Sequence, residues 1–184
     1  MRKVLVLASH GFLAMASNAF AQPQQKGHDV RWDLVQIVQA TVLAGGTDVG
    51  RDMANGDTVS LGGSGDAEPA EGDAFGGGRF VHRHANLTEV AHGVWVVTGF
   101  MSWQPGGGAL PIADGIGNAS EESAGILTMA VRLFPAGGSP HDAVLSVNCQ
   151  LPGATFAIVE GITLAVDGFN FVQAGGGTLF HVQK

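Results

Sequence analysis

Glycine is the residue that most constrains how this chain can fold. The 184 residues include 29 glycines, and many of them stand in six clusters, at 45–46, 62–63, 76–78, 106–108, 137–138 and 175–177. The segments between these clusters are short and rich in Val, Ile, Leu, Thr and Phe, the composition typical of strands. Because glycine weakens helices and marks turns, the pattern predicts short strands joined by turns rather than long helices.

Eight segments have the composition of strands: 32–43, 58–61, 79–84, 89–103, 125–134, 143–151, 158–166 and 178–183. They predict an all-β fold, either a single antiparallel β-barrel or a β-sandwich of about eight strands. The first segment is ambiguous, since Trp32, Val35, Val38 and Val42 also fit one stripe of a helix. The stretches 62–78 and 105–122 are predicted to be long loops, the second a candidate pocket mouth.

The N-terminus has the pattern of a secretory signal peptide. Arg2 and Lys3 precede an apolar run at 4–16, and Ala19-Phe20-Ala21 fits the usual cleavage pattern of small residues. We therefore predict a signal peptide at 1–21, cleavage near Ala21, and one all-β domain at 22–184 that is secreted or periplasmic. The apolar run is too short to span a bilayer, and no later stretch is long enough, so no transmembrane segment is predicted in the mature chain.

The charge of the mature chain argues against a nucleic-acid partner. Loss of Arg2 and Lys3 changes the formal net charge from −7 to −9, and the remaining basic residues are scattered along the sequence. Phosphate binding needs clustered Lys and Arg, which are missing from this sequence. The partners that we expect are a small molecule, a glycan or an extracellular protein.

Two further residues are placed by strand alternation. The chain has a single cysteine, Cys149, so no disulfide within the chain is possible. In a strand at 142–151 Cys149 shares a face with Leu145, Val147 and Leu151, which predicts a buried core thiol rather than a nucleophile. His181 alternates with apolar neighbours and is predicted to face solvent.

The most specific chemistry in the sequence lies in His82-Arg83-His84 and Glu89. In a strand, His82 and His84 point to the same face. If residues 85–88 form a hairpin loop, Glu89 lies opposite His84, and two imidazoles converge with a carboxylate. Such a set suits a divalent transition metal with open positions for substrate. The alternative is a pair of solvent-facing histidines with an ordinary cross-strand contact to Glu89.

This cluster resembles the first metal-binding motif of the cupins, with Gly76, His82, His84 and Glu89 at the motif spacing. Val96 stands where the motif ends in glycine. The second cupin motif is echoed by Pro135, Gly137, His141 and Asn148, with the last two spacings too long. The resemblance implies that His82, His84, Glu89 and His141 hold one Fe, Mn, Ni or Zn ion in an oxygenase or isomerase.

A second resemblance covers more of the chain. The segments 31–33, 56–59, 76–82, 142–149 and 160–166 are similar to segments of small, secreted, glycine-rich bacterial proteins that have no established activity. This resemblance implies an exported all-β domain and carries no catalytic residues.

Three function classes follow, and whether the chain is an enzyme stays open. The first is a secreted noncatalytic β-domain, without a cofactor, that binds a small apolar ligand, a glycan or a surface partner. The second is the cupin-like metal enzyme. The third is a metal-free β-barrel cyclase or isomerase whose candidate acid is Glu160, because a carboxylate on an otherwise apolar strand face has a raised pKa if it is buried. A bulge at Gly161 that turns Glu160 outward is the structural alternative.

Overall fold

The computed structural model describes residues 29–183, which contain twelve strands and one short 3-10 helix, so the signal peptide predicted at 1–21 lies outside the described residues. The strands are β1 (Val30–Val38), β2 (Thr41–Ala44), β3 (Asp48–Asp52), β4 (Thr58–Glu68), β5 (Asp73–Arg83), β6 (Glu89–Gly107), β7 (Ala113–Asp114), β8 (Glu122–Pro135), β9 (His141–Cys149), β10 (Gly161–Val166), β11 (Phe169–Gly175) and β12 (Gly177–Val182), and the helix η1 is Ala119–Glu121. The predicted all-β class is confirmed. No helix in the described part of the chain is long and apolar enough to cross a membrane.

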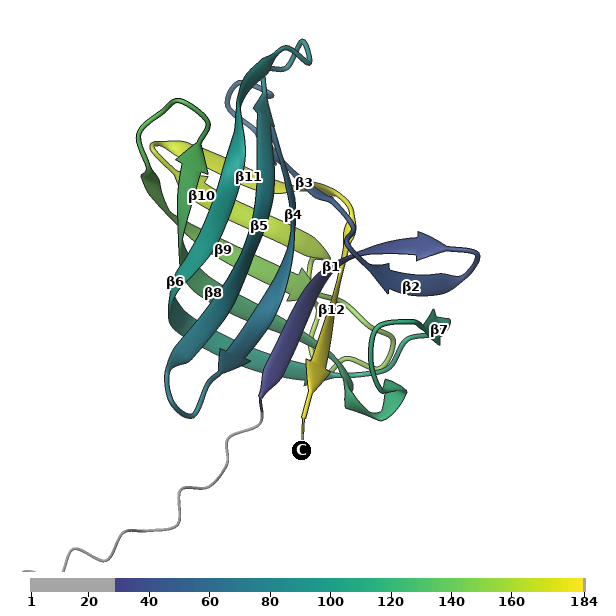
Figure 1. The fold of residues 1–184 in the computed structure, drawn as a ribbon. Helices are drawn as coiled ribbons and strands as arrows, with labels where there is room; N and C mark the ends of the chain where they lie inside the picture. The colour runs from purple at the N-terminus through teal and green to yellow at the C-terminus, as the bar shows by residue number, and fades with distance from the viewer. Residues whose placement is uncertain (1–28, 184) are drawn as a thin grey trace, which may run out of the picture.

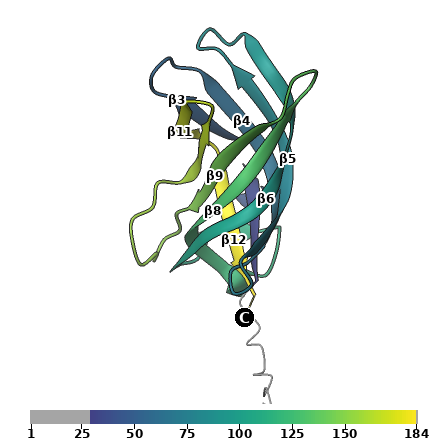
Figure 2. The same ribbon diagram turned by 90° about the vertical axis from the view of Figure 1, so that its left-hand side faces the viewer.

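The strands form one sheet that closes on itself. Strands β3 to β6 follow one another as antiparallel neighbours, and so do β8 to β11. Pairing of β6 with β8 and of β11 with β3 joins these two runs into an eight-stranded ring. In Figure 1 the steep strands β4, β5 and β6 lie in front of β8, β9 and β10, which cross behind them. Figure 2 shows the β6, β8 and β9 side of the same ring.

Strands β1 and β12 close a second, smaller ring at one end of the molecule. Strand β12 pairs with β8, β1 pairs with β12, and β1 also pairs with β4. The long strands β4, β5, β6 and β8 therefore belong to both rings. Strand β6 can follow both because its pairing with β8 shifts register at three places, and such bulges let a strand bend.

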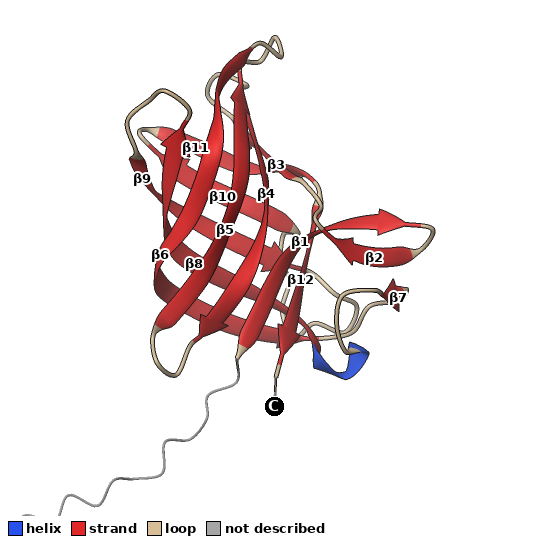
Figure 3. Cartoon of the chain, in the orientation of Figure 1, coloured by secondary structure: helices blue, strands red, loops and turns tan. Residues whose placement is uncertain are grey.

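The first predicted strand, 32–43, is two strands rather than one, and the helical alternative is wrong. Val38 pairs with Thr41, which leaves Gln39 and Ala40 as a two-residue loop with φ of 50° and 58°. Both φ values match a type I′ turn, whose twist suits a hairpin. Figure 3 shows β2 projecting from the body of the molecule, with the short β7 beside it.

The long loop predicted at 62–78 is wrong, because β4 and β5 pair through almost all of it. The glycines there leave room for two tryptophans. Trp32 and Trp95 are buried and stacked, with ring centroids 5.7 Å apart. A Cβ atom on Gly65 would lie 2.7 Å from the Trp32 ring, and one on Gly63 would lie 2.8 Å from the Trp95 ring. These glycines are needed for packing inside the sheet and do not mark a turn.

The stretch 105–122 is mostly loop, as predicted, and it covers the end of the molecule where β1 and β12 lie. Within it Asp114 of β7 binds His181 of β12 through an Oδ2 to Nε2 contact of 2.8 Å. The His181 side chain is only 3% exposed, so the prediction that it faces solvent is wrong. The reason is that this loop folds over the face that β12 would otherwise present to water. The stretch does not line the apolar cavity described below.

Candidate functional site

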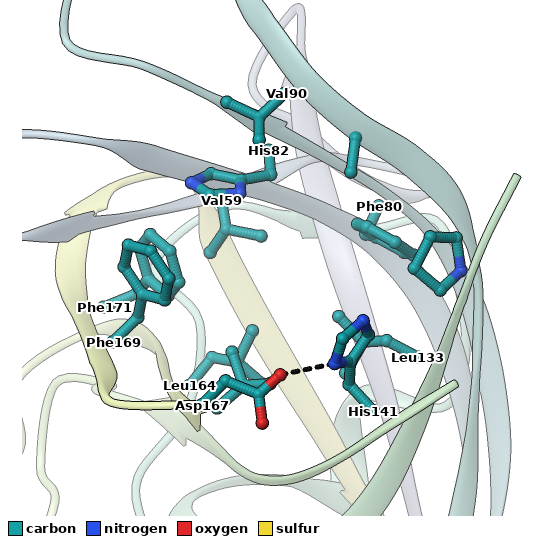
Figure 4. Close-up of a pocket in the computed structure, with 13 residues that line it drawn as sticks. Val59, Phe80, His82, Val90, Leu133, His141, Leu164, Asp167, Phe169 and Phe171 are labelled. Atoms are coloured by element: carbon teal, nitrogen blue, oxygen red, sulfur yellow. Dashed lines mark ion pairs between the residues drawn. The ribbon is translucent and has the colours of Figure 1, made fainter. Parts of the chain in front are cut away.

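A cavity of about 250 Å³ opens at one end of the eight-stranded ring, near the start of β4 and away from the part of β4 that pairs with β1. Its wall is formed by β4, β5, β6, β8, β9, β10 and β11, and Figure 4 shows the side chains that face it. The lining residues are mainly aliphatic and aromatic: Val59, Phe80, His82, Val90, Ala91, Leu133, Pro135, His141, Leu164, Val166, Asp167, Phe169 and Phe171. The mouth of a closed sheet is a common place for a ligand.

The hairpin of β10 and β11 supplies the aromatic wall of the cavity. Val166 pairs with Phe169, so Asp167 and Gly168 form the two-residue loop, with φ of 47° and 85°. Strand alternation then places Phe169 and Phe171 on the same inner face, where their rings stack 5.5 Å apart. Strand β11 is absent from the sequence prediction. The signal that could have found it is Asp167-Gly168 between alternating apolar residues, a strong hairpin pattern.

Histidine 82 lies between this aromatic wall and a buried carboxylate. Its ring meets Phe169 and Phe171 edge to face, with centroids 5.3 and 5.5 Å away (Figure 4). On its other side, Nε2 lies 3.3 Å from Oδ2 of Asp57. Nδ1 of His84 lies 3.2 Å from the same Oδ2 atom. The predicted convergence of His82 and His84 is therefore found, but the carboxylate between them is Asp57.

Asp57 is held in place by the turn between β3 and β4. Its Oδ1 accepts a hydrogen bond from the backbone N–H of Ala85, and its own N–H donates to Oδ1 of Asn55. Burial acts to raise the pKa of Asp57, but the hydrogen bonds from His84, Ala85 and His82 outweigh it and lower the pKa below the usual range. Asp57 is thus an ionised, acceptor-only group. Strand alternation could not identify it, because it lies in a turn and comes from another hairpin.

Glu89 does not join His82 and His84. A register shift after His82 places Glu89 opposite Arg83, so the predicted pairing of Glu89 with His84 is wrong. The carboxylate of Glu89 instead lies 2.7 Å from Nδ1 of His92, on an exposed part of β6. Within residues 29–183, no group of three or more His, Cys, Asp or Glu side chains is arranged to hold a metal ion.

His141 lines the same cavity as His82, from the opposite wall. Its Nδ1 forms an ion pair with Oδ2 of Asp167 (Figure 4). The two histidines therefore share a cavity, but each is paired with a different aspartate. The cupin-like set of His82, His84, Glu89 and His141 is divided among three separate groups of contacts.

Glu160, the candidate acid, lies outside the cavity. It directly precedes β10, and its carboxylate accepts hydrogen bonds from the N–H groups of Gln150 and Thr178, at 2.5 and 2.7 Å. Burial raises the pKa of Glu160 although these hydrogen bonds act to lower it. The side chain connects the end of β9 to the start of β12, which is a structural role.

The prediction that Cys149 is a core thiol is confirmed. The residue is fully buried, and its Sγ donates to the backbone carbonyl of Thr178 at 3.3 Å. Burial, together with the negative charge of Glu160, raises the pKa of Cys149 to about 12. A thiol that stays protonated at neutral pH is a poor nucleophile.

Comparisons with known proteins do not identify a family for this chain. No protein-family model, no curated protein and no solved structure matches the chain. The cavity and its residues are therefore the features of the chain that bear on its function.

Proposed function

We propose that the chain is an exported, noncatalytic binding domain whose ligand is a small apolar molecule held at the mouth of the eight-stranded ring. The observation that carries this proposal is the cavity lined by Phe80, Leu164, Phe169 and Phe171. Export rests on the signal-peptide pattern at 1–21.

The size and lining of the cavity suit a compact ligand. Its volume of about 250 Å³ compares with roughly 150 Å³ for an apolar cavity that admits benzene. Burial of an apolar ligand there is favourable by about 25 cal/mol for each Å² removed from water. The two stacked phenyl rings offer a flat wall against which another ring can pack.

The same lining disfavours the other partners considered for a binding domain. A sugar carries hydroxyl groups on all sides, and most of them would lose hydrogen bonds to water in a cavity with few polar side chains. A protein partner needs a contact area of about 800 Å² on each side, so it would have to bind to a surface outside this cavity.

The two catalytic alternatives lack a matching geometry. The metal enzyme requires Glu89 beside His82 and His84, but Glu89 contacts His92 and Arg83. The metal-free cyclase or isomerase requires Glu160 at the cavity wall, but the carboxylate of Glu160 binds backbone N–H groups of Gln150 and Thr178.

The test is calorimetric titration of the purified chain with propylbenzene. We expect saturable binding of one molecule per chain with a negative heat-capacity change, the mark of apolar burial. Ala91 lines the cavity and is the cross-strand neighbour of His82 in the pairing of β5 with β6. Ala91→Trp therefore fills the mouth of the cavity and should abolish binding. The matched control is Ala165→Trp, because Ala165 is exposed on β10 and does not line the cavity. Absence of binding to the unmodified chain, or equal binding by both variants, would contradict the proposal.

A further inference from the structure

The polar side chains that line the cavity are few and similar in kind. Only His82, His141 and Asp167 among the lining residues carry polar side chains, and both histidines have one ring nitrogen beside an aspartate. The positions of the protons on these nitrogens decide which ligand group the cavity can accept.

The aspartates determine these positions. A carboxylate that is ionised can only accept hydrogen bonds, so the nitrogen that faces it carries the proton. Nε2 of His82 therefore donates to Asp57, and Nδ1 of His141, the nitrogen beside the Asp167 carboxylate, carries the proton of that ring. Above the usual pH range of histidine titration the imidazole is neutral and has one N–H and one lone pair. The lone pairs are thus on Nδ1 of His82 and Nε2 of His141, and neither atom forms a hydrogen bond with another described residue.

Asp57 is fixed in its acceptor role by more than one donor. It is 5% exposed and also takes hydrogen bonds from His84 and from the Ala85 amide. Since three donors converge on it, Asp57 cannot turn to receive a proton from the ligand side. The orientation of the His82 ring follows from this arrangement and from the edge-to-face contacts with Phe169 and Phe171.

The polar side-chain atoms available to a ligand are then all hydrogen-bond acceptors. They are the lone pairs of the two imidazoles and the oxygens of Asp167, which is 57% exposed at the rim. An anionic ligand would meet acceptors and negative charge with no cation among the lining residues. An ammonium group would lose its hydration in an apolar cavity, at a cost that one partly exposed carboxylate compensates poorly.

We propose that the ligand is a compact neutral alcohol, aromatic or alicyclic, whose hydroxyl group donates to the free ring nitrogen of His82 or His141. This assignment rests on the proposed function, because it names the class of molecule that the same cavity binds. The apolar part of the ligand packs against Phe169, Phe171 and Leu164, and the hydroxyl group selects it from plain hydrocarbons of the same shape.

The test compares three compounds that differ in one group: propylbenzene, 4-propylphenol and 4-propylbenzoate. Titrations are made at about pH 8, above the usual range of histidine titration and below that of phenols. We expect the phenol to bind up to about tenfold more tightly than propylbenzene, the effect of one hydrogen bond, and the benzoate to bind most weakly. A fourth compound, 3-phenylpropylammonium, keeps its positive charge at this pH and should also bind more weakly than the phenol.

Variants locate the acceptor. His82→Leu should reduce the preference for the phenol to less than about twofold while propylbenzene still binds. The matched control is His92→Leu, because His92 is 61% exposed and lies outside the cavity. If Nε2 of His141 is the acceptor, His141→Leu has this effect in place of His82→Leu. The comparison of compounds on the unmodified chain needs no variant to fold.

The outcomes separate this inference from the proposed function. Equal binding of propylbenzene and phenol, or tighter binding of the benzoate, overturns the alcohol assignment and leaves the apolar site standing. If both His82→Leu and His141→Leu still prefer the phenol to propylbenzene, the alcohol assignment is also overturned. Failure of all the compounds to bind overturns both the assignment and the proposed function.

Discussion

At the scale of single residues, the role of glycine depends on what packs against it. Gly63 and Gly65 lie inside β4, where the rings of Trp95 and Trp32 come so close that a side chain has no room. The sequence pattern treats every glycine cluster as a turn signal. No local feature distinguishes the glycines under Trp32 from those in turns, because Trp32 is more than thirty residues away in the chain.

The first prediction concerns Gly65. Gly65→Ala places a Cβ against the backbone oxygen of Phe75 and 2.7 Å from the Trp32 ring, so we expect overpacking to lower the free energy of unfolding by roughly 1–3 kcal/mol. Urea unfolding followed by tryptophan fluorescence measures the change. Gly99→Ala is the control, because its nearest neighbour would be Ala130 at 4.0 Å. Equal effects of the two substitutions would show that the close packing around Gly65 does not limit the side chain at this position.

Contacts between residues far apart in the sequence also decide which site residues could be predicted. His82 and His84 were identified because strand alternation places them on one face, and that part of the prediction is confirmed by their shared contact with Asp57. The carboxylate was misidentified because a one-residue register shift changes which side chain of β6 lies opposite. Such register shifts depend on local backbone geometry, which cannot be predicted from the spacing of residues in the sequence.

At the scale of secondary structure elements, the sequence predicted the central strands and missed the ones that close the ring. Strands β3 and β11 pair with each other and complete the eight-stranded ring. Their sequences are atypical, since β3 carries Asp48, Arg51 and Asp52, and β11 carries Asn170 and Gln173. Both are strands because their neighbours satisfy their backbone groups, a tertiary effect that composition does not reveal.

The second prediction concerns the loop that holds β7 and η1. Asp114 and His181 are 2% and 3% exposed and connect this loop to β12. His181→Leu leaves the Asp114 carboxylate buried without its imidazole partner, and we expect a loss of roughly 3 kcal/mol in the free energy of unfolding. Denaturant unfolding and amide hydrogen exchange in residues 108–121 measure the loss and its location.

The exposed pair of His92 and Glu89 provides the control for this prediction. His92→Leu breaks an ion pair whose side chains are 61% and 47% exposed, so its effect should stay below about 1 kcal/mol. A loss for His181→Leu as small as this would mean that the buried contact does not secure the loop.

At the scale of the whole molecule, the buried carboxylate of Asp48 makes stability depend on pH. Asp48 is fully buried, and burial, followed by the negative charge of Glu160, raises its pKa from 3.8 to about 7. The folded state therefore holds a proton that the unfolded state releases above pH 3.8. The stability associated with Asp48 is fully present below that pH and is lost as the pH rises through about 7.

The third prediction concerns this loss of stability with rising pH. Asp48→Asn cannot ionise, so we expect its stability to fall less than that of the unmodified chain between pH 3.8 and about 7. Midpoints of thermal unfolding measured across this range test the difference. A steeper fall for Asp48→Asn, or parallel curves, would show that Asp48 is ionised in the folded chain throughout.

The two ends of the described chain lie side by side. Val30 pairs with Val182, and the N–H of Gln183 donates to the carbonyl of Asp29 at 2.9 Å. A short peptide linker could therefore join residues 29 and 183 without disturbing either ring, and the chain could be opened instead at the tip between β4 and β5. The order in which the strands are synthesised would then change while every pairing stayed the same. The described residues therefore form a circular arrangement of strands whose first and last strands meet at β1 and β12.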